Sequence, residues 1–192
     1  MSVAPLTRPV SSVVRQEKRM ESKFYQNWHL AKTDSEYRVT EFEWSIIRFY
    51  EAFSRWVTTT GSVLTDADIK FSEHLILHVI RMQNRPKSSA TIARMINRDD
   101  IPNIQYSLRK LESAKLIRKT KEKAGKIFSY SVTEAGKRMT DEYADIRSDL
   151  LLKAIGTISN IDERITEMTQ LLSVLTGIYE EMARSAATFS TP

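Results

Sequence analysis

Cysteine is absent from this chain of 192 residues, and proline and glycine occur only five times each. Without cysteine, the chain can form no disulfide, thiolate zinc site, iron–sulfur cluster or cysteine nucleophile, and such a composition suits a reducing compartment. We therefore expect a cytoplasmic protein. The sequence also lacks long apolar runs: none exceeds three residues, whereas a membrane-spanning helix needs about 20.

The scarcity of proline predicts the fold class. The prolines stand at positions 5, 9, 86, 102 and 192, so the tracts 10–85 and 103–191 lack the strongest helix breaker. With 41% hydrophobic and 28% charged residues, the chain has enough apolar mass to bury a core. These features predict a mainly helical protein.

Positive charge is concentrated in one segment. The total formal charge of +5 says little by itself, because many proteins carry such a charge for solubility. Between Lys87 and Lys126, however, eleven basic residues stand against four acidic ones, a net charge of +7, while the remaining eighteen basic and twenty acidic residues give −2. A basic segment in a slightly acidic chain indicates a nucleic-acid partner.

Two long apolar stripes flank the basic segment. The first alternates spacings of three and four, which predicts one helix ending near Gly61: Val39, Phe42, Ile46, Phe49, Phe53 and Trp56. The second repeats this alternation over three heptads, in a helix opened by Asn160: Ile161, Ile165, Met168, Leu172, Leu175, Tyr179 and Met182. One small lobe cannot cover both, which indicates a homodimer. The alternative is that the two stripes bury each other within one chain.

The elements between the stripes follow a recognisable order. Thr65 and Asp68 can cap one helix, Ser88 or Ser89 a short second one, and Asp100 or Ile101 a third, with Pro102 in its first turn. Helical spacing predicts that Ile104, Leu108 and Leu111 of the third helix face inward. The residues expected to face outward are Asn103, Gln105, Tyr106, Arg109 and Lys110.

A change of period then predicts a β-hairpin from Ile117–Thr120 and Ile127–Val132, around a tip at Lys121–Lys126. Thr133 caps a long helix that is broken at Gly156. The fold class expected is mainly α with a small β-hairpin wing: a winged helix-turn-helix lobe plus long dimerisation helices.

This order coincides with the basic segment and suits DNA. A helix fits the major groove, where Asn and Gln can read adenine and Arg can read guanine, while lysines on a hairpin reach phosphates. The candidate DNA-binding residues are Ser89, Thr91, Arg94, Asn103, Gln105, Tyr106, Arg109, Lys110, Arg118, Lys121, Lys123 and Lys126. Taken one at a time, each residue is better explained as part of a solvated helix face or a charged turn; the concentration of positive charge in one module favours nucleic-acid binding for the module as a whole.

Three tracts resemble the MarR family of transcription regulators: Ser88–Ala93, Leu108–Arg118, and Val132–Gly136 after the hairpin. The resemblance covers residues 39–185. It implies a DNA-binding regulator, a repressor acting as a homodimer on a pseudo-palindromic promoter site and released by a small-molecule effector. Two features depart from the family: lysines occupy the wing tip where an Asp-x-Arg pattern is usual, and Lys115 replaces the glycine before the first wing strand.

The chain divides into five expected parts. These are an N-terminal arm over residues 1–35, in which Met20, Phe24 and Trp28 recur at helical spacing, a dimerisation helix over 36–62, the winged lobe over 63–136, C-terminal dimerisation helices over 137–188, and a tail over 189–192.

An effector site is implied by the resemblance alone. Many MarR-like proteins bind small aromatic or acidic effectors where the dimerisation helices meet the lobe, and the candidates here are Trp44, Phe49, Phe53, Trp56, Phe71 and His74. The alternative is that these side chains only pack in the core and the dimer.

Metal binding and catalysis have weak support. His74 and His78 stand at i, i+4 but lack a third ligand, so we expect one packed and one exposed histidine, no metal and no cofactor. No phosphate loop or nucleophile elbow is present, so we expect no enzyme. The rival function is a winged-helix protein-interaction or assembly module, which would expose apolar residues where the third helix carries Asn103, Gln105, Arg109 and Lys110.

Overall fold

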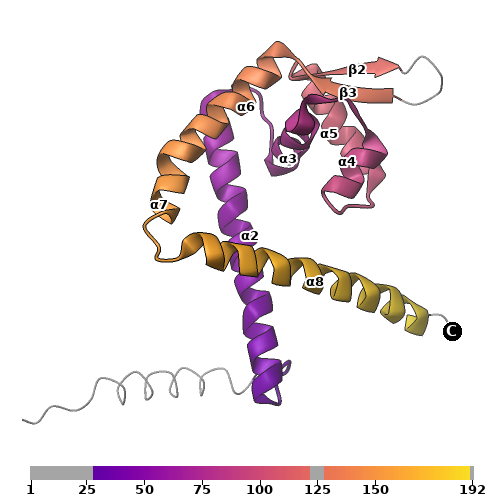
Figure 1. Cartoon of the computed structure of the whole chain (residues 1–192). Helices are drawn as coiled ribbons and strands as arrows, with labels where there is room; N and C mark the ends of the chain where they lie inside the picture. Colours follow the sequence, from indigo (N-terminus) through magenta and orange to yellow (C-terminus); the bar gives the residue numbers. More distant parts are fainter. Residues whose placement is uncertain (1–27, 122–127, 191–192) are drawn as a thin grey trace, which may run out of the picture. The chain divides into compact units, whose positions relative to one another are not determined.

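The computed structural model describes residues 28–121 and 128–190 (Figure 1). Met20 and Phe24 of the expected arm, together with the candidate DNA-binding residues Lys123 and Lys126, lie outside the described residues. The chain forms two compact units, Met1–Thr59 and Thr60–Pro192.

Most of the first unit's described part is the helix α2 (Asp34–Leu64), whose last turn belongs to the second unit. The helix begins five residues before the apolar stripe, because Thr33 and Glu36 cap it reciprocally. The Glu36 amide donates to Thr33 Oγ1 at 3.3 Å, and the Thr33 amide donates to the Glu36 carboxylate at 3.0 Å. Trp28 packs edge-on against Trp44, with ring centroids 5.7 Å apart.

After the last turn of α2, the second unit continues with the short helices of the predicted lobe. They are α3 (Phe71–Arg81) with the 3₁₀ turn η1 (Met82–Asn84), α4 (Ser89–Met95) and α5 (Ile101–Ser113). Ser88 caps α4 by accepting a hydrogen bond from the Thr91 amide at 3.2 Å, as predicted.

The predicted cap of α3 is wrong. Lys70 occupies the N-cap position, and its amide donates to the Glu73 carboxylate at 2.8 Å. Thr65 Oγ1 instead accepts from the Ala67 amide at 3.2 Å, within the preceding turn.

A small antiparallel sheet follows, in the order β1-β3-β2. Strands β2 (Ile117–Lys121) and β3 (Phe128–Val132) form the predicted hairpin, and β1 (Lys87–Ser88) pairs with the far side of β3. Strand β1 was not predicted, because two residues are too few to show a periodicity.

The C-terminal part is helical. Helix α6 (Glu134–Ile146), capped by Thr133 as predicted, continues through the π-helical turn η2 (Arg147–Leu152) and α7 (Lys153–Ile155) to Gly156. Helix α8 (Ile161–Ala187) and the turn η3 (Thr188–Ser190) complete the chain. Among the described residues, no helix is both long enough and apolar enough to cross a membrane.

One hydrophobic core holds the lobe together. It draws side chains from all three short helices, from the sheet and from the start of α6, and its fully buried members include Ile76, Leu77, Ile80, Ile92, Ile104, Leu108 and Leu111. This core fixes the orientation of α5 and the sheet, which carry most of the candidate DNA-binding residues.

Candidate nucleic-acid interface

Helix α5 presents one apolar face to the core and one polar face to solvent. Ile104, Leu108 and Leu111 are completely buried, as their helical spacing predicted. On the opposite side Asn103, Tyr106 and Arg109 are exposed, and Tyr106 keeps 58% of its surface accessible. These exposed side chains could contact base edges in the major groove of DNA.

Helix α4 and α5 are joined by a tight turn. Asn97 ends α4 in the left-handed region, with φ at 54°. The amide of Asn97 donates a hydrogen bond to the Arg94 carbonyl at 3.3 Å, and the amide of Arg98 donates one to the Ala93 carbonyl at 3.0 Å. These two hydrogen bonds form a Schellman motif. Asparagine tolerates this conformation better than most side chains. The turn sets the angle at which α5 leaves α4.

The candidates on α4 differ in exposure. Arg94 is exposed, whereas Ser89 and Thr91 are half-buried at the first turn. Thr91 Oγ1 lies 3.0 Å from Ser88 Oγ, so this hydroxyl belongs to the helix cap.

A buried carboxylate attaches α5 to α3. Glu73, 4% exposed, accepts a hydrogen bond from Ser107 Oγ at 2.7 Å. Lys110 Nζ lies 3.8 Å from Glu73 and 3.6 Å from Asp68. Lys110 is therefore half-buried and paired with two carboxylates, rather than facing outward as the helical spacing predicted.

A second ionic group lies at the start of α5. Arg98 donates from Nε to Asp100 Oδ1 at 2.8 Å and from its terminal nitrogen to Oδ2, while Asn103 Nδ2 donates to the same Oδ2 at 3.0 Å. These hydrogen bonds, that of Arg98 first and that of Asn103 second, lower the pKa of the Asp100 carboxyl to about 2. Asp100 occupies the N-cap position but makes no side-chain cap bond.

The sequence did not assign this role to Arg98 or Asp100, although the Arg-Asp-Asp tract between two helices could have indicated an ion pair.

The wing carries exposed cations on β2. Arg118, Lys119 and Lys121 are exposed; Arg118 Nε donates to Ser131 Oγ at 3.0 Å, and Lys119 Nζ lies 4.0 Å from the centre of the Phe128 ring. The phenol of Tyr130 donates to Gln105 Oε1 at 3.4 Å. This contact joins the wing to α5, and it turns the half-buried Gln105 toward the sheet.

Lys87, counted in the basic segment, does not contribute to its surface. Only 3% of it is exposed, and its Nζ donates to the carbonyls of Ile80 and Arg85 at 3.2 Å each and to that of Met82. Burial, and secondly the charge of Arg85, lower the pKa of Lys87. Lys87 thus closes the turn after α3.

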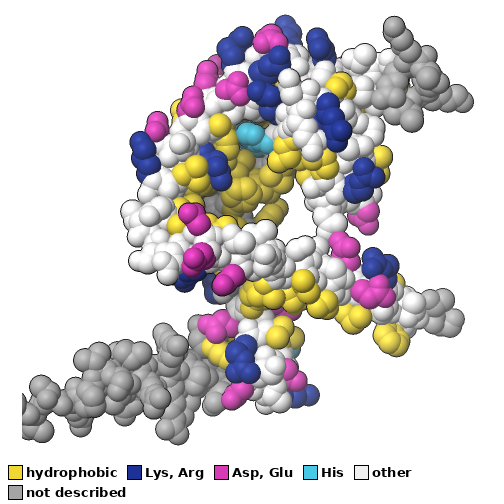
Figure 2. Space-filling model, in the orientation of Figure 1, with side chains coloured by type: hydrophobic (Ala, Val, Ile, Leu, Met, Phe, Trp, Pro, Cys, Tyr) yellow, Lys and Arg dark blue, Asp and Glu magenta, His cyan; other side chains and the backbone are white. Residues whose placement is uncertain are grey.

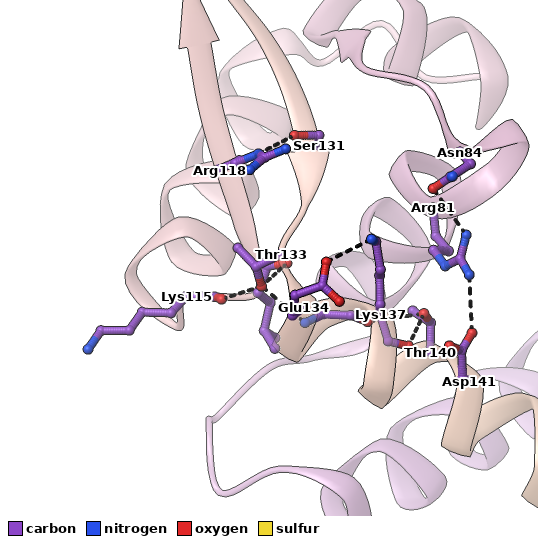
Figure 3. Close-up of polar contacts among 12 residues, drawn as sticks. Arg81, Asn84, Lys115, Arg118, Ser131, Thr133, Glu134, Lys137, Thr140 and Asp141 are labelled. Carbon is purple, nitrogen blue, oxygen red and sulfur yellow. Dashed lines mark hydrogen bonds and ion pairs between the residues drawn. The ribbon is translucent and has the colours of Figure 1, made fainter.

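The junction between wing and α6 is tightly built, as Figure 3 shows for Lys115, Thr133 and their neighbours. Thr133 Oγ1 donates to the Lys115 carbonyl at 2.7 Å and accepts from the Gly136 amide at 3.1 Å. A Cβ on Gly136 would lie 2.1 Å from the Leu116 carbonyl oxygen. The Thr-Glu-Ala-Gly tract is therefore explained by close backbone approach at this junction.

A cavity of about 340 Å³ opens beside this junction. Three cationic side chains line it, Arg85, Arg118 and Lys137, together with Glu134, which pairs with Lys137 at 2.7 Å (Figure 3). None of the effector candidates lines this cavity.

The effector candidates fall in both units. In the first, Trp44, Phe49 and Phe53 are exposed and Trp56 is half-buried, and the rings of Phe49 and Phe53 stack at 6.3 Å. In the second, Phe71 is half-buried and His74 is buried. Their role as an effector site stays a prediction.

His74 is buried and His78 is half-buried, so the expectation that one of the two is exposed is wrong. His74 is 1% exposed, and its pKa is lowered to about 4 by burial first and by His78 second. His78 packs against the Tyr143 ring at 4.6 Å, and burial lowers its pKa as well. Within residues 28–121 and 128–190, no group of three metal-ligating side chains occurs.

Comparisons with known proteins agree with this geometry. Residues 69–136 match the winged helix DNA-binding domain family. Curated protein sequences give no match.

Among solved structures, NMB1585, a MarR family regulator from Neisseria meningitidis, is 15% identical with a TM-score of 0.63, over 78% of this chain and 98% of that one. A mutant MarR from E. coli complexed with operator DNA is 17% identical with a TM-score of 0.60, over 74% and 99%. BldR, a transcriptional regulator from Sulfolobus solfataricus, is 16% identical with a TM-score of 0.59, over 73% and 98%.

Residues 69–136 thus have the fold of a winged helix domain. The chain is similar in fold to the MarR family regulators, which confirms the fold class expected from the sequence, mainly α with a small β-hairpin wing.

Proposed function

We propose that this protein is a transcription regulator that binds promoter DNA through α5 and the wing. The observation that carries the proposal is the exposed polar face of α5, with Asn103, Tyr106 and Arg109, in one unit with the exposed cations of β2. A recognition helix reads base edges and a basic strand contacts phosphates. The polar face of α5 would therefore select the sequence, and the cations of β2 would bind the DNA backbone. The mutant MarR solved with operator DNA supports the proposal by its similar fold.

Titration of fluorescent duplex DNA at increasing salt tests this function. Affinity should fall linearly on a log–log plot, with a slope of about 0.9 for each neutralised phosphate, because bound lysines and arginines release counterions. Absence of binding at low salt, both to the DNA upstream of the protein's own gene and to random duplexes, would refute the proposal.

The regulator acts as a homodimer in this proposal. Helix α8 has no buried residue, and its exposed apolar side chains, which include Met168, Leu171 and Met182, follow its length (Figure 2). A second copy would cover such a face. Two lobes related by a two-fold axis place their recognition helices about 34–36 Å apart, which requires a pseudo-palindromic site.

Sedimentation of matched variants tests the dimer. Met168→Glu with Leu171→Glu adds two charges to the apolar face, whereas Gln170→Glu with Ser173→Glu adds the same two charges at exposed polar positions. The first pair should yield monomers and the second should not. Monomeric wild-type protein at micromolar concentration would favour the alternative in which the apolar faces are covered within one chain.

Repression and effector release complete the proposal. A dimer on its promoter site would occlude polymerase, and a small aromatic or acidic effector would release it by binding more tightly to a conformation that fits DNA poorly. Mapping the genomic sites that the protein binds should show pseudo-palindromes over promoters. Transcription from these promoters should rise in a strain from which the gene is deleted. Bound sites outside promoters, or transcription that falls, would contradict repression.

A further inference from the structure

We infer that Asp100, held by Arg98, orients the amide of Asn103 so that α5 reads adenine in preference to guanine. This inference rests on the proposed DNA-binding function and adds a residue that determines specificity without needing to touch a base. It concerns the first turn of α5, and the N-terminal residues of a recognition helix are those that contact base edges.

The Asp100 carboxylate is fixed on both oxygens. Arg98 contacts Oδ1 and Oδ2 with two nitrogens, in the forked geometry that a guanidinium offers to a carboxylate. The third contact of Arg98 runs from NH1 to Ser72 Oγ on α3, at 3.1 Å. The carboxylate therefore has a position set by the lobe and not by its own rotamer alone.

This fixed carboxylate selects one orientation of the Asn103 side chain. Asn103 Nδ2 donates to Asp100 Oδ2 at 3.0 Å, while the residue as a whole is exposed. A carboxylate accepts hydrogen bonds but cannot donate them, so the amide cannot exchange its oxygen and nitrogen without losing this bond. Because the pKa of Asp100 is about 2, the carboxylate stays charged at any pH at which DNA is bound.

Counting the remaining donors gives the base preference. An Asn side chain has two N–H groups and one carbonyl oxygen, and Asp100 takes one N–H. One donor and one acceptor are left, which match N7 and the N6 amino group of adenine. Guanine presents two acceptors, N7 and O6, so one of them would face the Asn103 oxygen. An amide free to rotate could turn both N–H groups toward guanine, and Asp100 prevents this.

Selection from a random duplex library tests the inference. The wild-type protein and the variants Asn103→Ala, Asp100→Ser and Asp99→Ser select bound duplexes, which are then sequenced. Serine is a good N-cap residue, so Asp100→Ser preserves the start of α5. Asp99→Ser makes the same change in charge one residue earlier. Arg98→Lys is a further variant, which keeps the charge and both carboxylates but loses the fork.

The expected result has three parts. Wild-type protein enriches adenine over guanine at a position that loses this preference in Asn103→Ala. Asp100→Ser lowers the adenine-to-guanine ratio at that position by about tenfold, the size of one good base contact, and Arg98→Lys lowers it in the same direction. Asp99→Ser leaves the ratio unchanged.

Other results overturn the inference without touching the proposed function. If Asp100→Ser and Asp99→Ser give equal adenine-to-guanine ratios, and thermal unfolding shows that both variants are folded, Asp100 does not set the preference. If Asn103→Ala changes the base preference at no position of the site, Asn103 reads no base. If Asp100→Ser does not fold, an unchanged adenine-to-guanine ratio in Arg98→Lys refutes the orienting role of the Arg98–Asp100 pair. Failure of the wild-type protein to bind any duplex would instead refute the function itself.

Discussion

Ser107 on the core-facing side of helix α5 donates a hydrogen bond of 2.7 Å to Glu73 on α3, 34 residues earlier in the chain. The carboxylate is buried and also accepts from the Lys70 amide at 2.8 Å. The orientation of α5 therefore depends on a buried polar contact as well as on apolar packing.

Removing the hydroxyl should destabilise the lobe. Ser107→Ala leaves one oxygen of the buried Glu73 without its donor, which costs about 1–3 kcal/mol in the free energy of unfolding. Ser113→Ala, at an exposed position of the same helix, should change it by less than about 0.5 kcal/mol. Urea unfolding measures both variants, and equal effects would contradict a structural role for Ser107.

A methyl group at Gly61 should be poorly tolerated. Its Cβ would lie 2.0 Å from Cε1 and Nε2 of His74, a ring that is 1% exposed. Gly61→Ala should therefore lower the free energy of unfolding by about 1–3 kcal/mol. A double-mutant cycle with His74→Ala isolates this contact, because the methyl group then meets a cavity instead of a ring. Additive effects of the two substitutions would rule out the clash.

Replacing Lys115 with glycine should stabilise the protein. Lys115 ends α5 with φ at 58°, a left-handed conformation that costs a residue with a Cβ about 1–2 kcal/mol and glycine nothing. Lys115→Gly should gain up to about 1 kcal/mol after the greater entropy of the unfolded glycine is subtracted. Lys115→Ala removes the same charge but keeps the Cβ, so it should gain nothing. A higher melting temperature for Lys115→Ala than for Lys115→Gly would be inconsistent with this strain.

The backbone at Lys115 illustrates what the sequence could predict. The position of this turn followed from the apolar spacing of α5 and the strand after it, and the departure from glycine was visible in the sequence. The left-handed φ of Lys115 became evident only from the structure. It accompanies two hydrogen bonds of the turn, from the Lys115 amide to the Glu112 carbonyl at 2.9 Å and from the Leu116 amide to the Leu111 carbonyl at 3.0 Å. Local patterns thus predicted most helices and the hairpin, because each has a periodicity or a cap of its own.

Features that depend on distant contacts could not be predicted in this way. The start of α3 depends on Glu73, whose burial is completed by Ser107 from α5. Lys87 shows that a nearby contact can be missed as well: it looks like any cation of the basic segment, yet carbonyls at the end of α3 and in the turn after it, two to seven residues away, accept from its Nζ. For the same reason the net charge of the segment overstates the charge available to DNA, since Lys87 is buried and Lys110 is paired with Glu73 and Asp68.

Stability should fall as the pH is lowered from about 6.5 to about 4. The pKa of His74 drops from 6.5 to about 4 on folding, chiefly because burial disfavours the charged ring. In this window the unfolded chain binds a proton that the folded chain does not, so protonation favours unfolding. The loss amounts to roughly 3 kcal/mol once the pH is below both pKa values.

Urea unfolding across this range checks the slope. His74→Leu removes one of two histidines whose pKa is lowered by burial and should make the dependence between these two pH values shallower, leaving the part due to His78. His29→Leu, at an exposed histidine, should leave the slope unchanged. A dependence that is equally steep in His74→Leu would assign the acid sensitivity to other groups.

Arg109 and Lys121 should affect DNA binding in different ways. Arg109 is exposed on the outward face of α5, where a guanidinium can read a guanine edge, so Arg109→Ala should reduce the preference for a selected duplex over a random one by about tenfold. Lys121 is exposed at the end of β2, beside the wing tip, where a lysine neutralises a phosphate of any sequence. Lys121→Ala should weaken all duplexes about equally and reduce the salt slope by about 1. Anisotropy titrations of both duplexes at several salt concentrations separate the two effects. Equal losses on every duplex for both variants would show that Arg109 also contacts only the backbone.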